Sequence, residues 1–151
     1  MDERTKYLGI DYGEKRVGIA VTDDSKSFSF SRDYILNDKY FWENLYKVMS
    51  EENISRIIVG YPLNLNSEKT IQTLKVEQFK TTLEIFLKKK LMNAEIFFYD
   101  ERFTSSIAIE NLIRSGLKKK KRQEKGLIDS HSARIILQDY IDKEKNINSK
   151  L

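Results

Sequence analysis

The sequence predicts an α/β protein built on a mixed five-stranded sheet with helices on both faces. Three strand-like segments separated by short polar turns come first, which is typical of an antiparallel meander. Short apolar strands then alternate with amphipathic helices, as in parallel strands joined by right-handed crossovers. Two helical segments close the chain, so the expected element order is β-β-β-α-β-α-β-α-α.

The first half of the chain follows this order from its local patterns. Strands are expected at residues 6–12, 16–23 and 27–36. Helical spacing then begins, carried by Phe41, Trp42, Leu45, Tyr46 and Met49. The short apolar run at 55–61 is typical of a strand buried in a parallel sheet.

The second half starts with a helix of about 20 residues, a length read from its apolar spacing. Its inward face is expected to hold Ile71, Leu74, Phe79, Leu83, Phe86 and Leu87. A strand at 94–99 and helices at 105–115 and 127–143 complete the chain, with 144–151 expected to fray. The last helix is expected to face inward with Ile135, Ile136, Tyr140 and Ile141.

Length and composition predict one globular domain spanning residues 1–151, with 40% hydrophobic and 33% charged residues. The absence of cysteine excludes disulfides and thiolate metal sites. Neither an export signal nor a membrane-spanning run is recognisable, so we expect a cytoplasmic protein that does not bind a membrane. The net charge of +4 is compatible with a polyanionic partner but does not by itself identify one.

Asp11 is the most informative residue, because a lone carboxylate ends an apolar strand directly before a glycine turn. Tyr7, Gly9 and Asp11 share one face of that strand. Gly9 and Gly13 are expected to leave room beside the acid for a phosphate or a metal ion. The alternative is a tight hairpin in which Asp11 only caps its own turn.

Two further acids are expected near Asp11. Glu101 directly follows the last strand, and the carboxyl ends of parallel strands meet at one edge of a sheet. The adjacent Asp100 points to the opposite face. Asp129 lies near the start of the last helix, where it either joins this site or only complements the helix dipole. His131 points about 200° around the helix from Asp129 and is interpreted as a packing or surface residue.

Three acids from separate segments, without a histidine or cysteine cluster, favour a hard cation such as Mg²⁺ or Mn²⁺. Two such ions can clamp the attacking water and the leaving oxygen of a phosphodiester. The pattern therefore predicts phosphodiester hydrolysis.

Four segments together resemble the YqgF/RuvX family of bacterial pre-16S rRNA nucleases, also labelled Holliday junction resolvase-like. They are LGIDYGEKRVGIAVTD at 8–23, VGYPLN at 59–64, YDERFTS at 99–105 and KGLIDSHSARIILQDY at 125–140. The resemblance implies an RNase H-like fold, a metal-dependent endonuclease and a role in maturation of the 16S rRNA precursor. By motif it implies an acidic triad of Asp11, Glu101 and Asp129, with phosphate contacts from Lys15, Arg16, Arg102 and Lys125.

The chain departs from the family pattern at a few positions. It has Phe103-Thr104-Ser105 where the family has Leu-Thr-Thr, and 65–68 lacks the usual glycine turn. The basic run Lys118–Arg122 leads toward Lys125 and Asp129. It either grips a nucleic-acid backbone or forms a solvated connector.

The sequence is compatible with three functions. An RNA endonuclease acting on pre-16S rRNA, with the ribosomal particle as a possible partner, is favoured. The second is a resolvase acting on branched DNA, and the third is a binding module without catalysis. The residues do not separate RNA from DNA, because phosphate contacts carry little sequence information. A monomer is favoured over a dimer, since no apolar stripe in the sequence marks an interface.

Overall fold

The computed structural model describes residues 4–101 and 125–149, and within the last helix it describes the side chains of residues 130–147. The helix expected at 105–115, the basic run at 118–122 and Arg102 therefore lie outside the described residues. No described helix is long and apolar enough to cross a membrane.

A mixed five-stranded sheet forms the centre of the molecule, as predicted. Its strands are β1 (Lys6–Asp11), β2 (Arg16–Thr22), β3 (Ser29–Leu36), β4 (Ile54–Tyr61) and β5 (Glu95–Asp100). Their spatial order is β3-β2-β1-β4-β5. The β1–β2 and β2–β3 pairs are antiparallel, whereas β4 pairs in parallel with both β1 and β5.

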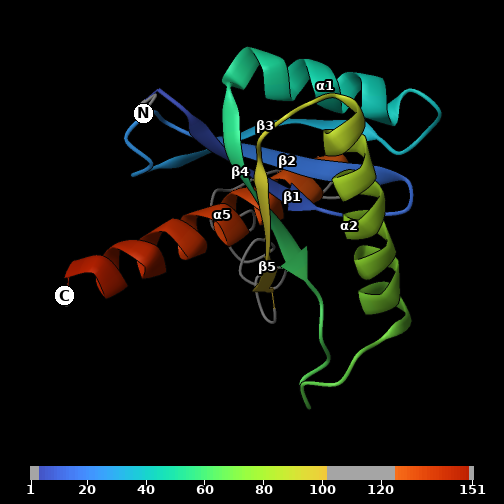
Figure 1. Ribbon diagram of the computed structural model, residues 1–151. Helices are drawn as coiled ribbons and strands as arrows, with labels where there is room; N and C mark the ends of the chain where they lie inside the picture. Colours follow the sequence, from blue (N-terminus) through green and yellow to red (C-terminus); the bar gives the residue numbers. More distant parts are fainter. Residues whose placement is uncertain (1–3, 102–124, 150–151) are drawn as a thin grey trace.

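Helices cover both faces of this sheet (Figure 1). Helices α1 (Phe41–Glu52) and α2 (Ile71–Lys89) pack on one face, and α5 (Lys125–Ser149) packs on the other. The larger core lies under α1 and α2, where Leu8, Ile10 and Val59 face Leu45 and Leu83. The smaller core lies under α5 and contains Tyr7, Ala20, Ile58, Ala133, Ile136, Leu137 and Ile141. Successive side chains of β1 point alternately into these two cores, because the side chains of a strand alternate between its two faces.

The buried face of α2 differs from the prediction at its first turn. Ile71 and Leu74 are 74% and 52% exposed, whereas Thr73 and Val76 are buried. Thr70 and Thr73 form a capping box, and the Thr73 hydroxyl also donates a hydrogen bond to the Pro62 carbonyl. These polar contacts turn Thr73 toward the sheet and its apolar neighbours toward solvent.

Helix α5 is longer than predicted: it ends at Ser149, whereas the predicted helix ends at residue 143. Beyond residue 143, Glu144 accepts hydrogen bonds from the hydroxyls of Tyr140 and Tyr7 at 3.0 and 3.3 Å. It also forms an ion pair with Arg56 of β4. Glu144 is therefore held against the sheet rather than in a frayed tail.

Candidate active site

Asp11 is the last residue of β1, the central strand of the sheet. Tyr7 and Gly9 contact α5 or its core, so the face shared by Tyr7, Gly9 and Asp11 is the one that α5 covers. Asp11 itself is half-buried. A carboxylate at this position is partly shielded from water.

The two glycines around Asp11 do not make room for a ligand, contrary to the prediction. A Cβ atom on Gly9 would lie 2.9 Å from Leu137 Cβ and 3.0 Å from the Ala133 carbonyl oxygen. Gly9 therefore allows α5 to approach the sheet closely. A Cβ atom on Gly13 would lie 2.4 Å from the Arg16 carbonyl oxygen, so Gly13 shapes the β1–β2 turn.

Glu101 continues β5 by one residue, and its amide donates a hydrogen bond to the Tyr61 carbonyl of β4 at 3.2 Å. Its carboxylate lies over Gly60 of β4, the strand that separates β5 from β1. A Cβ atom on Gly60 would lie only 2.1 Å from Glu101 Oε2. Any other side chain at position 60 would occupy the place of the Glu101 carboxylate.

The carboxyl groups of Asp11 and Glu101 are joined by a hydrogen bond across β4. Burial raises the pKa of Glu101 from 4.5 to about 7, against the opposing effect of the hydrogen bond with Asp11. The charge of Asp100 raises this pKa further. Two carboxyl groups in direct contact cannot both carry a full charge without a compensating proton or cation.

The backbone of α5 places Asp129 at the same end of the sheet. Tyr7 is opposite Glu144 and Tyr140, whereas Gly9 is opposite Leu137 and Ala133, so α5 runs antiparallel to β1. Two strand residues advance about 6.6 Å. Four helix residues advance about 6 Å. The helical turn that contains residue 129 is therefore level with Asp11, although its side chain is outside the described part.

The predicted phosphate contacts are only partly described. Lys15 is exposed in the β1–β2 turn, and Arg16 is half-buried at the start of β2, both at the Asp11 end of the sheet. The turn is held by Asn37, whose amide nitrogen Nδ2 donates to the Gly13 carbonyl at 2.9 Å. The side chain of Lys125 is not described, although its backbone begins α5.

His131 agrees with its interpretation as a packing residue. It is half-buried, and burial lowers its pKa, with a further contribution from the charge of Arg134. Its Nε2 lies 3.4 Å from Nη2 of Arg134.

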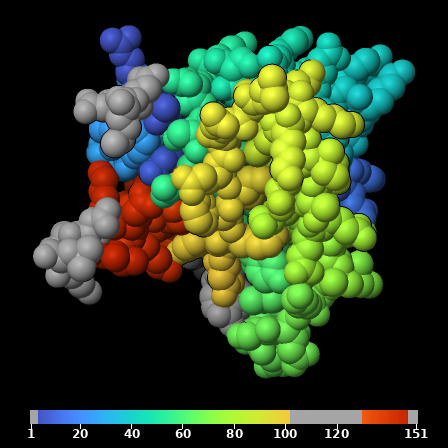
Figure 2. Space-filling model, in the orientation of Figure 1, coloured from blue at the N-terminus to red at the C-terminus, as the bar shows by residue number. Residues whose placement is uncertain are grey.

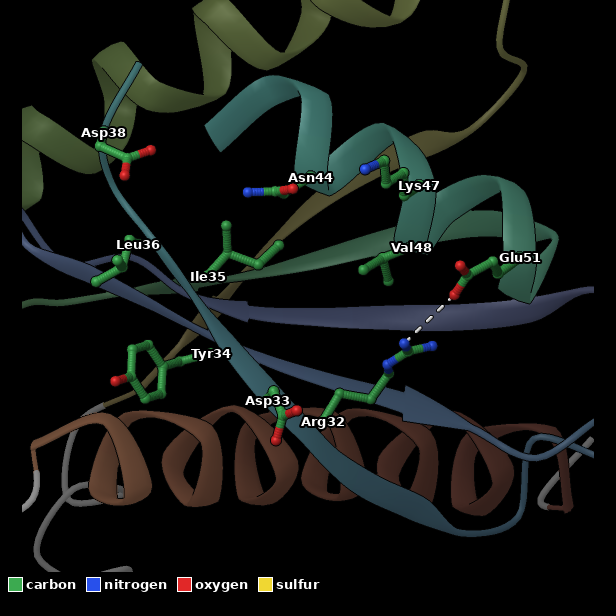
Figure 3. A pocket seen from close by; sticks show the side chains of 10 residues that line it. All are labelled: Arg32, Asp33, Tyr34, Ile35, Leu36, Asp38, Asn44, Lys47, Val48 and Glu51. Atoms are coloured by element: carbon green, nitrogen blue, oxygen red, sulfur yellow. Dashed lines mark hydrogen bonds and ion pairs between the residues drawn. The ribbon is translucent and has the colours of Figure 1, made fainter. Parts of the chain in front are cut away.

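A separate groove of about 410 Å³ lies between β3 and α1. It also contains carboxylates, but Asp33, Asp38 and Glu51 lie at three distant corners, and Glu51 pairs with Arg32 (Figure 3). The described side chains include no group of three histidine, cysteine or acidic residues able to hold a metal ion. The side chain of Asp129 lies outside this described part of the chain.

Gly60 is a position beside the acidic pair whose structural role sequence reasoning missed. From its place in VGYPLN, Gly60 could shape the end of the strand or contact a ligand. Neither role predicts that the Glu101 carboxylate lies over Gly60. The signal for this arrangement is a glycine on the middle one of three parallel strands, level with Asp11 on one neighbour and two residues short of Glu101 on the other.

Comparisons with known proteins agree on the family and the fold. The RuvX family model, described as Holliday junction resolvase, matches residues 5–143. A Phocaeicola vulgatus protein named "Putative pre-16S rRNA nuclease" is 36% identical over 143 residues, covering 95% of this chain and 99% of the relative. A Flavobacterium psychrophilum protein of the same name is 37% identical over 152 residues, covering 92% and 98%.

Two solved structures share the fold at low sequence identity. RuvC of T. thermophilus in complex with a Holliday junction substrate has a TM-score of 0.57 and 12% identity, covering 94% of this chain and 96% of its own. The yeast mitochondrial Holliday junction resolvase Ydc2 has a TM-score of 0.55 and 13% identity, covering 97% and 84%. These similarities support the RNase H-like fold. With the family match over nearly the whole chain, they lead to one conclusion: the chain belongs to the RuvX family.

Proposed function

We propose that the protein is a metal-dependent endonuclease whose Asp11, Glu101 and Asp129 bind Mg²⁺ or Mn²⁺. The observation that carries this proposal is the direct contact between the Asp11 and Glu101 carboxyl groups, with the pKa of Glu101 near 7. Such a pair needs a positive charge between its oxygens, which a proton supplies below about pH 7. A divalent cation with oxygen ligands satisfies the same charge requirement.

The donor set fits a hard cation. Two carboxylates meet at the end of β1, and the α5 turn carrying Asp129 is level with them. When bound, such a cation supplies a hydroxide nucleophile and stabilises the charge on the phosphate. Asp11, Glu101 and Asp129 would hold it, and the partial burial of Asp11 and Glu101 would strengthen its electrostatic effect on the phosphate.

The basic residues at this end of the sheet are proposed to bind the phosphate backbone. Lys15 in the β1–β2 turn and Arg16 at the start of β2 follow Asp11, whereas Arg102 and Lys125 lie near the other two acids in sequence. Cations are required here because three carboxylates alone repel a polyanion. The Asn37 hydrogen bonds with Gly13 and Tyr12 fix the turn that carries Lys15.

The substrate is proposed to be RNA, specifically the 16S rRNA precursor, processed in the cytoplasm with the ribosomal particle as a partner. The names of relatives that span nearly the whole chain support RNA. Branched DNA is the second candidate, because structural neighbours were solved with Holliday junctions. An RNA nuclease can act as a monomer, whereas cutting two symmetric strands of a junction requires a dimer.

A cleavage assay tests this proposal. Purified protein is incubated with precursor 16S rRNA fragments and with a four-way DNA junction, each with Mg²⁺, Mn²⁺ or EDTA. We expect metal-dependent cleavage of the RNA fragments and little cleavage of the junction. The reverse preference would support the resolvase function. Failure to cut either substrate with either metal would contradict a nuclease function.

A further inference from the structure

We propose that the buried hydroxyl of Ser130 is a positioning group for Asp11: it donates a hydrogen bond to the Asp11 carboxylate when this carboxylate binds a divalent cation. Ser130 lies in the first part of α5, next to Asp129 in sequence. The inference rests on the metal site of the proposed function and adds to that site a residue outside the three acids.

The Ser130 hydroxyl is a buried polar group without a hydrogen-bond partner. Ser130 is only 5% exposed, and its Oγ atom makes no hydrogen bond within the described part of the chain. A serine inside a helix can donate to the carbonyl four residues earlier, but this hydroxyl does not. Burying a hydroxyl without a partner costs stability. A role in catalysis or ligand binding is one of the few reasons to retain such a group.

The position of Ser130 on the helix turns its side chain toward the sheet. Ser130, Ala133 and Leu137 are spaced three and four residues apart, so they share one face of α5. Ala133 and Leu137 lie against Gly9 of β1. The Ser130 carbonyl also accepts a hydrogen bond from the Ser31 hydroxyl of β3 at 3.3 Å. This turn of α5 is therefore held on the sheet, with Ser130 on the buried side.

Ser130 is level with Asp11 along the sheet. Asp11 lies two residues beyond Gly9, and two strand residues advance about 6.6 Å. Because α5 runs antiparallel to β1, the same distance corresponds to about four residues toward the start of α5. Counted from the Gly9 contacts at Ala133 and Leu137, the turn around residue 130 lies beside Asp11. Helix side chains also lean toward the N-terminus, here toward the end of the sheet that carries Asp11.

Helix α5 packs closely enough for this contact. In Figure 2 the red atoms of α5 lie directly against the orange atoms of β5 and the blue atoms of the N-terminal strands. Ser132 is also buried with an unpaired hydroxyl. Two helix residues turn its side chain by about 200°, away from the face that Ser130 shares with Leu137. Of these two hydroxyls, only that of Ser130 faces β1.

The hydrogen bond between the two acids explains why the Ser130 hydroxyl has no acceptor in this structure. Asp11 is bonded to Glu101 across β4. When both carboxylates hold a cation, they no longer bond each other, and the Asp11 oxygens can accept other donors. Carboxylates that bind metal ions are usually held by such outer donors, which fix their orientation. The Ser130 hydroxyl can supply one by rotation about a single bond, without losing another partner.

Binding of Mn²⁺ to the full chain, measured by calorimetry without substrate, tests this proposal. The test variant is Ser130→Ala, which removes only the hydroxyl. Urea unfolding in EDTA is measured on the same protein, so that an effect on the metal site is distinguished from an effect on folding.

Ser29→Ala is the matched control. Ser29 is a second buried serine under α5, but its hydroxyl is paired, because it donates to the Arg134 carbonyl at 2.8 Å. It is also distant from Asp11. Ser29 pairs with Thr22, whose hydroxyl accepts a hydrogen bond from the Tyr7 amide, so Ser29 is level with the start of β1.

The two variants should have opposite effects. Ser130→Ala should weaken Mn²⁺ binding about tenfold, as expected for loss of an outer hydrogen bond to a metal ligand. It should leave the urea midpoint in EDTA unchanged or raise it, because it removes an unpaired buried group and alanine favours the helix. Ser29→Ala should lower the urea midpoint in EDTA. Its Mn²⁺ affinity should stay within about twofold of the original, because distant sites couple weakly.

Three results would overturn the proposal: an unchanged Mn²⁺ affinity of Ser130→Ala, an equal loss of affinity in both variants, or a lower urea midpoint of Ser130→Ala in EDTA. The last result would show that the hydroxyl is already paired without a cation.

The same measurements separate this proposal from the proposed function. Weaker Mn²⁺ binding by Ser130→Ala, without cleavage of any substrate by the original protein, would support the role of Ser130 and contradict the nuclease. Metal-dependent cleavage with an unchanged Mn²⁺ affinity of Ser130→Ala would do the opposite. An original protein that binds no Mn²⁺ would overturn both the role of Ser130 and the proposed metal site.

Discussion

The Asp11–Glu101 pair should destabilise the protein without metal at neutral and alkaline pH. Burial raises the pKa of Glu101 from 4.5 to about 7, so between these values the folded protein holds a proton that the unfolded chain has released. The free energy of unfolding therefore falls as pH rises from 4.5 to about 7 and is constant above that. Below pH 4.5 both states are protonated, and the penalty is absent.

Glu101→Gln removes this penalty. The difference between 4.5 and about 7 corresponds to a free energy of about 3 kcal/mol, at about 1.4 kcal/mol per pH unit. The Gln amide can still donate a hydrogen bond to Asp11. At pH 8 in EDTA, we expect the variant to be more stable than the original protein by up to about 3 kcal/mol. For a chain of this length, that is a melting temperature about 6–12 °C higher.

Urea unfolding in EDTA at pH 4.5, 6 and 8 measures this difference directly. Glu95→Gln is the control, because Glu95 is an exposed carboxylate on the same strand. The stabilisation by Glu101→Gln should grow between pH 4.5 and 8, whereas that of Glu95→Gln should stay near zero. A Glu101→Gln variant that is equally stabilised at all three pH values, or destabilised at pH 8, would refute the reasoning. Excess Mn²⁺ should stabilise the original protein more at pH 8 than at pH 5, since metal and proton compete.

Three other predictions follow from the site. Asp11→Asn should abolish cleavage while leaving RNA binding in EDTA and folding intact; cleavage at the original rate would assign the activity to another site. Gly60→Ala should displace the Glu101 carboxylate at little cost in stability, because the atoms that must move are the ends of the flexible Glu101 and Ile136 side chains, and it should weaken Mn²⁺ binding in calorimetry. Unchanged Mn²⁺ affinity would contradict a role in holding the ion for the Glu101 carboxylate in its place over Gly60. Replacing residues 118–122 by Ser or Gln should flatten the slope of log K against log salt by about 0.7 to 0.9 per lost phosphate contact. An unchanged slope would identify this run as a solvated connector.

For residues 4–101 and 125–149, the sequence by itself determined the element types, their order and the strands of the sheet. The alternation that buries Leu8 and Ile10 on one face and Tyr7 on the other is a local property of a strand, and the spacing of Phe41, Leu45 and Met49 is a local property of a helix. Both can be read from neighbouring residues. The buried face of α2 was predicted less accurately, because Thr73 is turned inward by its contact with Pro62 in the preceding loop.

The tertiary structure decided which residues meet across the sheet. Gly9 allows α5 to pack closely on the sheet and does not make room for a ligand. Gly60 leaves the space that the Glu101 carboxylate occupies. Both roles depend on the register of neighbouring strands and on the distance of a helix from the sheet. Neither quantity is encoded in the spacing of residues along one segment. The raised pKa of Glu101 has the same origin, because burial beside Asp11 arises only when β1, β4 and β5 are aligned.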